Sequence, residues 1–235
     1  MDKGKISAII LAAGSGSRMK SDVHKQYLLI HDKPLIYYAL KVFEESCVDE
    51  IILVTVPGEE EYCRKEIVEK YQFKKVTEII SGGKERYHSV YNGLKRLKHS
   101  EYVLIHDGAR PFVTIDIIEK NIAAVKLENA CVTAVLSKDT LKIADSSGYI
   151  EETLDRNKVW SIQTPQTFKT ELIRNAYDKI IHSNCDGITD DAMVLETVSQ
   201  HPIKIIPGDY QNIKITTPED ILIGELFLSK TAAHK

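Results

Sequence analysis

Runs of Ile, Val, Leu and Ala recur along the chain with few polar residues between them. Four of these runs have the length of a strand: Ile6–Ala12, Glu50–Val56, Glu101–His106 and Ala130–Leu136. A strand that is apolar on both sides is covered on both faces, as in a parallel sheet flanked by helices. The runs therefore predict the buried strands of a largely parallel sheet.

Between these runs the apolar residues recur with the period of a helix. The stretches that show this pattern are Leu35–Glu45, Glu60–Lys70, Glu85–Leu97 and Ile115–Leu127. Pro34 stands where a first helical turn tolerates proline, and Thr114 is placed to cap the helix that follows it. Alternation of strand and helix predicts an α/β fold of the Rossmann-like, doubly wound type with a mostly parallel sheet.

The pattern changes after residue 137. The segment 138–155 alternates loosely around a turn at 146–148, which predicts a two-stranded β-ribbon projecting from the sheet as an arm at about 138–158. An isolated ribbon is marginally stable, so we expect it to pack on a second subunit. The remaining elements expected are helices at Thr170–His182 and Asp190–Ser199, strands at Ile203–Ile206 and Asn212–Ile215, and a last helix from Pro218. With no internal repeat and no linker, 1–235 is predicted to be a single domain.

The composition of the 235-residue chain excludes several classes of protein. A net charge of -3 without a basic stripe gives no indication of nucleic-acid binding. The apolar run 6–13 is too short for a membrane span and leads into Gly and Arg, so we expect no membrane association. Four cysteines without CxxC or zinc spacing are typical of reduced thiols in a cytoplasmic protein.

A glycine-rich loop follows the first predicted strand, at the sheet edge where α/β proteins bind ligands. Its small residues, Gly14, Ser15 and Gly16, allow backbone N–H groups to approach phosphate oxygens. A dinucleotide fingerprint would need glycine where Met19 stands, and a P-loop is excluded because Glu85 follows Gly83-Lys84. The loop carries its own cations, Arg18 within it and Lys25 shortly after it, which favours a triphosphate ligand. The alternative is a strand-to-helix turn whose glycines serve geometry alone.

The loop LAAGSGSRM, with Lys25-Gln26 after it, resembles the signature of the sugar-phosphate nucleotidyltransferases. Further segments narrow the resemblance to the 2-C-methyl-D-erythritol 4-phosphate cytidylyltransferases of the non-mevalonate isoprenoid pathway: SGGKER at 81–86, HDGARP at 106–111, QTPQTF at 163–168 and NIKIT at 212–216. The resemblance covers nearly the whole chain in the right order. It implies a single nucleotidyltransferase domain, a homodimer, Mg²⁺ as cofactor, and CTP and a small polyol phosphate as substrates.

The resemblance also implies roles for individual residues. Catalytic cations are expected at Arg18, Lys25 and Lys214. The CTP site is expected at Ala12, Ala13, Gly14, Ser15, Gly16, Gly82, Gly83 and Ser89. The acceptor site is expected at Arg110, Thr140 and Arg156, with the last two on the arm and reaching the active site of the other subunit.

Asp107 is the candidate magnesium ligand. It follows an apolar strand, and a carboxylate at that edge suits Mg²⁺, which takes one or two protein oxygens plus phosphates. The alternative is a capping Asp or one paired with Arg110. Strand alternation turns His106 to the opposite face, which indicates a structural role. Asp190 and Asp191 are expected to be charges at a helix N-terminus, not catalytic acids.

Two other functions remain open at this point. A ribitol 5-phosphate cytidylyltransferase would share the loop, the lysines and the metal ligand, whereas a non-catalytic nucleotide-binding regulatory module would be expected to lack at least one of them. Two departures from the family pattern are His24, where proline is common before the Lys-Gln pair, and Gly108, where alanine is common.

Overall fold

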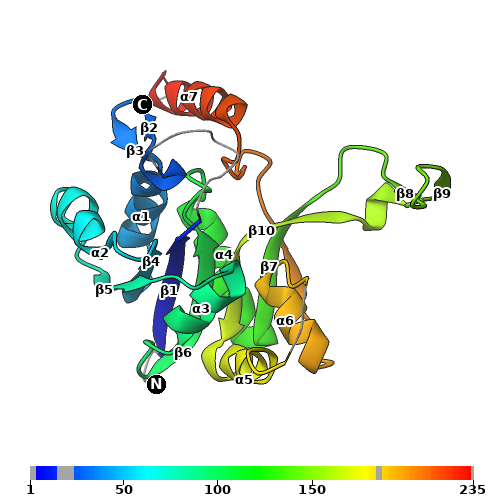
Figure 1. Ribbon diagram of the computed structural model, residues 1–235, viewed down its shortest axis with the longest axis horizontal. Helices are drawn as coiled ribbons and strands as arrows, with labels where there is room; N and C mark the ends of the chain where they lie inside the picture. Colours follow the sequence, from blue (N-terminus) through cyan, green and yellow to red (C-terminus); the bar gives the residue numbers. More distant parts are fainter. Residues whose placement is uncertain (1–3, 15–23, 184–186, 234–235) are drawn as a thin grey trace.

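The computed structural model describes residues 4–14, 24–183 and 187–233, and its centre is a seven-stranded sheet (Figure 1). The strand order is β11-β7-β10-β6-β1-β4-β5, and every neighbouring pair is parallel except those of β10, which is antiparallel to β6 and β7. The strands are β1 (Lys5–Ala12), β4 (Glu50–Thr55), β5 (Val76–Ser81), β6 (Ser100–Asp107), β7 (Ala130–Leu136), β10 (Trp160–Lys169) and β11 (Lys204–Pro207). The predicted mostly parallel α/β sheet is confirmed.

Helices cover both faces of this sheet. In chain order the described helices are α1 (Leu35–Glu45), α2 (Glu60–Tyr62), α3 (Arg86–Leu94), α4 (Ile115–Glu128), α5 (Thr170–Ile180), α6 (Asp191–Val198) and α7 (Pro218–Ala233). Of these, α7 packs in a small third core and not on a face of the sheet. The helix expected at 60–70 is wound differently from the prediction, because α2 continues into a π-helix at Cys63–Glu69. The predicted cap of α4 is confirmed: the Thr114 side chain accepts a hydrogen bond from the Ile117 N–H at 3.2 Å.

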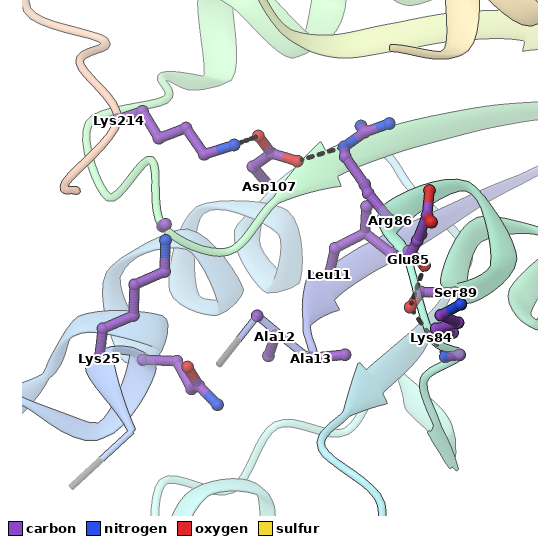
Figure 2. Close-up of a pocket in the computed structure, with 14 residues that line it drawn as sticks. Leu11, Ala12, Ala13, Lys25, Lys84, Glu85, Arg86, Ser89, Asp107 and Lys214 are labelled. Atoms are coloured by element: carbon purple, nitrogen blue, oxygen red, sulfur yellow. Dashed lines mark hydrogen bonds and ion pairs between the residues drawn. The ribbon is translucent and has the colours of Figure 1, made fainter. Parts of the chain in front are cut away.

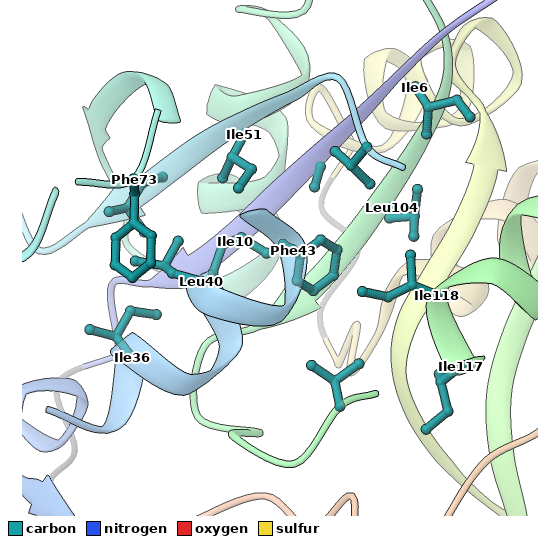
Figure 3. Close-up of a cluster of buried hydrophobic side chains, with 14 of the residues drawn as sticks. Ile6, Ile10, Ile36, Leu40, Phe43, Ile51, Phe73, Leu104, Ile117 and Ile118 are labelled. Atoms are coloured by element: carbon teal, nitrogen blue, oxygen red, sulfur yellow. The ribbon is translucent and has the colours of Figure 1, made fainter. Parts of the chain in front are cut away.

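Alternate residues of β1 enter two hydrophobic cores. Ile10 packs with Phe43 of α1 and Ile118 of α4 on one face (Figure 3), while Ile9 faces the other core, formed with α3, α5 and α6. Each fully buried side chain of this size contributes about 1.5–3 kcal/mol to folding. Because both faces are filled, the carboxyl edge of the sheet is left as the place for a ligand.

That edge lies at a reversal of the strand order. From β1 the chain moves outward to β4 and β5, and it then returns to β6 on the other side of β1. In open α/β sheets the crevice at such a switch point is the usual ligand site. The residues that end β1 and β6 face it together (Figure 2).

Two strands of the central sheet and one loop differ from the sequence-based expectation, and a short hairpin of β2 (Leu29–Ile30) and β3 (Lys33–Pro34) was not expected either. The apolar pattern did not indicate β5, a half-exposed edge strand, or β10, whose buried residues include Gln163, Thr164, Gln166 and Thr167. The expected strand at 212–215 is wrong: this segment is an extended loop, in which Ile215 donates to the Ala109 carbonyl at 2.8 Å. Its alternating apolar residues pack into a small third core beside α7, which mimics a strand pattern.

The predicted β-ribbon is confirmed. β8 (Lys142–Ala144) and β9 (Ile150–Thr153) pair antiparallel around a turn at Gly148, and the ribbon projects from the body as an arm (Figure 1). All residues of both strands are exposed. Within the described residues no helix combines the length and apolar character needed to cross a bilayer. Cys47, Cys63 and Cys131 are free thiols, and Cys185 lies outside the described residues.

Candidate active site

A cavity of about 310 Å³ opens at the carboxyl ends of β1 and β6 (Figure 2). It brings together eight of the residues expected from the sequence, which come from segments far apart in the chain. These are Ala12, Ala13, Gly14, Lys25, Gly83, Ser89, Asp107 and Lys214. Leu11, Gln26, Lys84, Glu85, Arg86 and Ala109 complete the lining.

Asp107, the last residue of β6, is held between two cations. Its Oδ1 accepts from Arg86 Nε at 3.0 Å, and its Oδ2 forms an ion pair with Lys214 Nζ at 2.7 Å (Figure 2). Burial would raise the pKa of this carboxyl, but Arg86, Lys214 and then Arg110 outweigh it and hold the pKa well below its usual range. Asp107 is therefore ionised at neutral pH and supplies a fixed negative charge to the pocket wall.

Arg86 is anchored in turn by a buried carboxylate. Its Nη1 and Nη2 donate to Asp191 at 3.0 and 2.8 Å, and Asp191 is completely buried. Burial would lower the pKa of Arg86, but Asp191 and Asp107 together raise it well above its ordinary value. As expected, Asp190 caps α6 by accepting from the Met193 N–H, but Asp191, in the first turn, bonds Arg86.

Close packing of small residues joins two loops beside the pocket. A Cβ placed on Gly82 would lie 2.3 Å from Ala13 Cβ, and one on Gly83 would lie 2.4 Å from His88 Cβ, so both positions require glycine. Gly83 donates its N–H to Ser89 Oγ at 2.9 Å, and Gly82 donates to the Thr55 carbonyl at 2.7 Å. Because both N–H groups are occupied, these glycines shape the pocket and offer no free amide donor to it.

Lys25 and Gln26 begin a short 3-10 helix, η2 (Lys25–Tyr27), on the opposite wall of the cavity. The Lys25 stem lies beside Gly14, since a Cβ on Gly14 would be 3.7 Å from Lys25 Cε. Gln26 is 2% exposed, and neither its Nε2 nor its Oε1 has a hydrogen-bond partner in the described part of the chain. His24, which precedes Lys25 where proline is common in the family pattern, contacts Glu59, with 2.5 Å between His24 Nδ1 and Glu59 Oε1.

A magnesium ion bound with a triphosphate needs one or two protein carboxylates, since phosphate oxygens and water complete its octahedron. Among the described residues no group of three or more His, Cys, Asp or Glu side chains is arranged to hold a metal by itself. Asp107 fits the smaller requirement because its carboxylate lies at the cavity wall. Its Oδ2 is held by a flexible lysine that a phosphate group can attract away.

Of the remaining expected residues that the structure describes, Gly82, Arg110, Thr140 and Arg156 do not line this pocket. The Arg110 guanidinium donates to the carbonyls of Asn212 at 2.8 Å and Ile162 at 3.4 Å, and Thr140 and Arg156 are exposed on the arm. Ser15, Gly16 and Arg18 lie outside the described residues. Arg110 is not paired with Asp107 by a salt bridge, which leaves the Asp107 carboxylate to Arg86 and Lys214.

Sequence reasoning assigned no role to Arg86 or Gln26, and it assigned Asp191 only the role of a charge at a helix N-terminus. Arg86 and Asp191 are 105 positions apart, and no local pattern connects them. For Asp191, the available signal of a buried role was an acidic residue at the start of a helix that is otherwise largely apolar. For Gln26 the signal was its place in the Lys-Gln pair.

The chain was compared with known proteins by sequence and by structure. The family model described as 2-C-methyl-D-erythritol 4-phosphate cytidylyltransferase matches residues 6–230. Proteins of that name from Lachnoclostridium phytofermentans and Lachnospira eligens are 50% and 51% identical to this chain; the matches cover 95% and 94% of this chain, and 96% and 98% of theirs.

A solved structure agrees with these sequence matches. The crystal structure of 4-diphosphocytidyl-2C-methyl-D-erythritol synthase from Anaerococcus prevotii superposes with a TM-score of 0.85 at 39% identity, covering 96% of this chain and 97% of that one. Together, the family match over almost the whole sequence and the shared fold show that the chain belongs to the 2-C-methyl-D-erythritol 4-phosphate cytidylyltransferase family.

Proposed function

We infer that the chain transfers the cytidylyl group of CTP to 2-C-methyl-D-erythritol 4-phosphate and releases pyrophosphate, a step of isoprenoid precursor synthesis by the non-mevalonate pathway. Membership of the family supports this activity. The structural observation that carries the assignment of the site is the meeting of Lys25, Asp107 and Lys214 in one cavity at the sheet's switch point.

The reaction needs alignment and positive charge more than an activated side chain. An oxygen of the acceptor's phosphate attacks the α-phosphorus, a new P–O bond forms, and the bond from the α-phosphorus to the bridging oxygen breaks. Pyrophosphate leaves with that electron pair. A phosphate monoester is already ionised at neutral pH, so no general base has to remove a proton, and catalysis consists of positioning and electrostatic stabilisation.

We assign Lys214 to the α-phosphate, and Lys25 and Arg18 to the triphosphate, with Asp107 as the protein ligand of magnesium. Lys214 is already inside the cavity, where its ammonium is 2.7 Å from the Asp107 carboxylate, and it needs to exchange one oxygen for another to reach a phosphate. Magnesium, when bound, supplies positive charge to the triphosphate oxygens. Donors fixed in place before the reaction stabilise the transition state without reorganising.

The cytosine is assigned to the cleft between the β1 loop and the loop that precedes α3. Ala12, Ala13 and Gly83 line this side with small groups, and Ser89 fixes the second loop by accepting from Gly83 and donating to the Glu85 carbonyl. Ser15, Gly16 and Gly82 are assigned to the same nucleotide site. Small residues on both sides of this cleft leave room for a flat pyrimidine ring.

We assign the acceptor to a site shared between two subunits. The arm carries the exposed apolar side chains Ile143, Tyr149 and Ile150, which are 42%, 75% and 65% exposed and would be covered in a dimer. Thr140 and Arg156, on the same arm, are exposed and outside the cavity of their own chain. With Arg110, they would complete the acceptor site of a second copy of the chain.

The activity is tested by measuring pyrophosphate release with CTP and Mg²⁺ for two acceptors. Turnover with 2-C-methyl-D-erythritol 4-phosphate should greatly exceed turnover with ribitol 5-phosphate. Equal or faster turnover with ribitol 5-phosphate would overturn the substrate assignment. Absence of turnover with either acceptor would favour a non-catalytic nucleotide-binding module.

The shared site is tested by mixing two inactive variants, Lys25→Ala and Arg156→Ala. In a mixed dimer one of the two sites contains both native residues, so random exchange should restore about a quarter of the native activity. If the mixture after exchange is no more active than its parents, the arm does not complete the site of the other subunit.

A further inference from the structure

A continuous chain of polar contacts runs from the buried core to the cavity. The Tyr177 hydroxyl donates to Asp191 Oδ1 at 2.6 Å, and Asp191 receives both terminal nitrogens of Arg86, at 3.0 and 2.8 Å. The third nitrogen of the guanidinium, Nε, donates to Asp107 Oδ1 at 3.0 Å. Neither Tyr177 nor Asp191 lines the cavity, and both are completely buried.

The two oxygens of Asp107 are held in very different ways. Oδ1 is bonded by an arginine whose three nitrogens are all engaged, so that Arg86 cannot turn to a ligand without leaving Asp191 buried and unpaired. Oδ2 is bonded by Lys214, whose side chain is 38% exposed and has a flexible stem on a loop. A ligand can therefore replace the lysine at Oδ2 at much lower cost than the arginine at Oδ1.

From this difference, and on the basis of the proposed function, we infer that Asp191 and Tyr177 are positioning residues that act through Arg86. They keep Oδ1 of Asp107 fixed so that Oδ2 alone changes partner, releasing Lys214 to the α-phosphate and facing the metal site. Groups that orient a ligating carboxylate from behind contribute to metal affinity and rate without touching the substrate.

Hydrogen bonds also fix the backbone at both aspartates of this series of polar contacts. The Asp191 N–H donates to Gln166 Oε1 at 3.0 Å, and the Asp107 N–H donates to Thr164 Oγ1 at 3.0 Å. Gln166 and Thr164 are both in β10, the antiparallel strand beside β6. One strand thus fixes the backbone of both aspartates, and Arg86 bonds the two carboxylates.

Two variants and two matched controls test the inference. Asp191→Asn removes the charge that anchors Arg86, and Asp178→Asn makes the same change at an exposed position that forms no hydrogen bond or ion pair with Arg86 or Gln166 in the described part of the chain. Tyr177→Phe removes one hydroxyl from Asp191, and Tyr91→Phe removes the corresponding bond to Asp178 on the exposed side of the stacked pair of rings.

The informative measurement is the affinity for CTP without acceptor, determined by calorimetry in EDTA and again with Mg²⁺. For Asp191→Asn we expect the affinity in EDTA to stay the same or increase, because a nearby negative charge is lost. The gain in affinity on adding Mg²⁺ should shrink, and kcat should fall by about 10- to 100-fold. Tyr177→Phe should show a smaller change in the same direction, and both controls should match the native protein.

Arg86→Lys provides a separate test, because an ammonium group cannot hold two carboxylates with the geometry of a guanidinium. The kcat of Arg86→Lys should fall about as far as that of Asp191→Asn. The inference is overturned if Arg86→Lys keeps the native kcat. It is also overturned if Asp191→Asn and Tyr177→Phe both gain as much CTP affinity from Mg²⁺ as the native protein does. A third contrary result is a loss of CTP affinity in EDTA, for Asp191→Asn, by the same factor as the loss of kcat. Failure of the native chain to bind CTP in either condition would instead refute the proposed function.

Discussion

The buried amide of Gln26 gives a prediction in which stability and ligand binding change in opposite directions. Both polar atoms of this side chain are buried without a partner among the described residues, at the wall of the cavity that opens at the carboxyl ends of β1 and β6. Replacement by methionine keeps the length and the unbranched shape of the side chain and removes both polar atoms. The ligand-free protein should therefore become more stable.

The magnitude follows from the cost of unsatisfied polar groups, which is about 1–3 kcal/mol for each buried donor or acceptor. The amide borders a cavity and can relax toward it, so we take the lower end for the pair and expect a gain of about 1–2 kcal/mol. For a domain of this size, each kcal/mol moves the melting temperature by about 2–4 °C. Gln26→Met should thus melt about 2–8 °C higher than the native protein without ligand.

Gln166→Met is the matched control, and its expected change in stability has the opposite sign. Gln166 is 1% exposed, but its Oε1 accepts from the N–H groups of Asp191 and Ala192, and its Nε2 donates to Asp190. The same substitution there leaves satisfied groups without partners and should lower the melting temperature. Both variants are compared by circular dichroism in EDTA without nucleotide, and then with CTP and Mg²⁺.

Addition of CTP should stabilise Gln26→Met less than it stabilises the native protein, because polar atoms of the ligand can satisfy the amide but not a thioether. A Gln26→Met protein that melts below the native protein without ligand would refute the reasoning. The amide would then have a partner in the folded state, and its burial would not be a cost.

Three further predictions concern charge, assembly and pH. Lys25→Ala should lower kcat by about 10²- to 10³-fold in the pyrophosphate assay, whereas Lys41→Ala, in an exposed pair with Glu45, should not; equal values would remove Lys25 from the mechanism. Ile150→Asp should give an inactive, folded monomer by light scattering, and an active dimer would contradict the role of the arm. Burial lowers the pKa of His106 to about 4, below the value of about 6.5 in the unfolded chain. The unfolded state therefore binds the extra proton, and stability is lost as pH falls from about 6.5 to 4, by on the order of 3 kcal/mol. His106→Gln should remove that part of the acid sensitivity in urea titrations, and an unchanged pH dependence would contradict it.

The strands that the sequence predicts are those that are buried among apolar neighbours on both faces. β1, β4, β6 and β7 were recognised from their composition, because a strand covered by helices on both faces needs apolar side chains on both faces. β10 escaped the same reasoning because its buried side chains are polar. Thr164 and Gln166, for example, bond to groups on β6 and α6, which lie far away in the sequence. A pattern of apolar residues reveals strands whose buried side chains are apolar. It does not reveal strands whose buried side chains are polar and hydrogen-bonded.

The same limit explains which parts of the site were predictable. Ala12, Ala13 and Asp107 were placed correctly at the cavity because they end predicted strands, and parallel strands end at one edge. The partner of Asp107 was not predictable. Arg110, three positions away, was the partner considered from the sequence, but its guanidinium bonds to backbone carbonyls, and the cations at Asp107 are Arg86 and Lys214. The positions of these cations depend on how separate segments pack.

The charges around Asp107 are compatible with a stable ligand-free fold that carries the proposed triphosphate site. Two carboxylates, Asp107 and Asp191, are balanced by two cations, Arg86 and Lys214, so the cluster is neutral and no buried charge lacks a partner. A bound triphosphate brings additional negative charge, which this neutral cluster cannot offset. Lys25, Arg18 and a magnesium ion are the groups proposed to balance it. Binding then proceeds by exchanging the partners of charges that are already paired, and the protein does not have to hold several bare cations together before the nucleotide arrives.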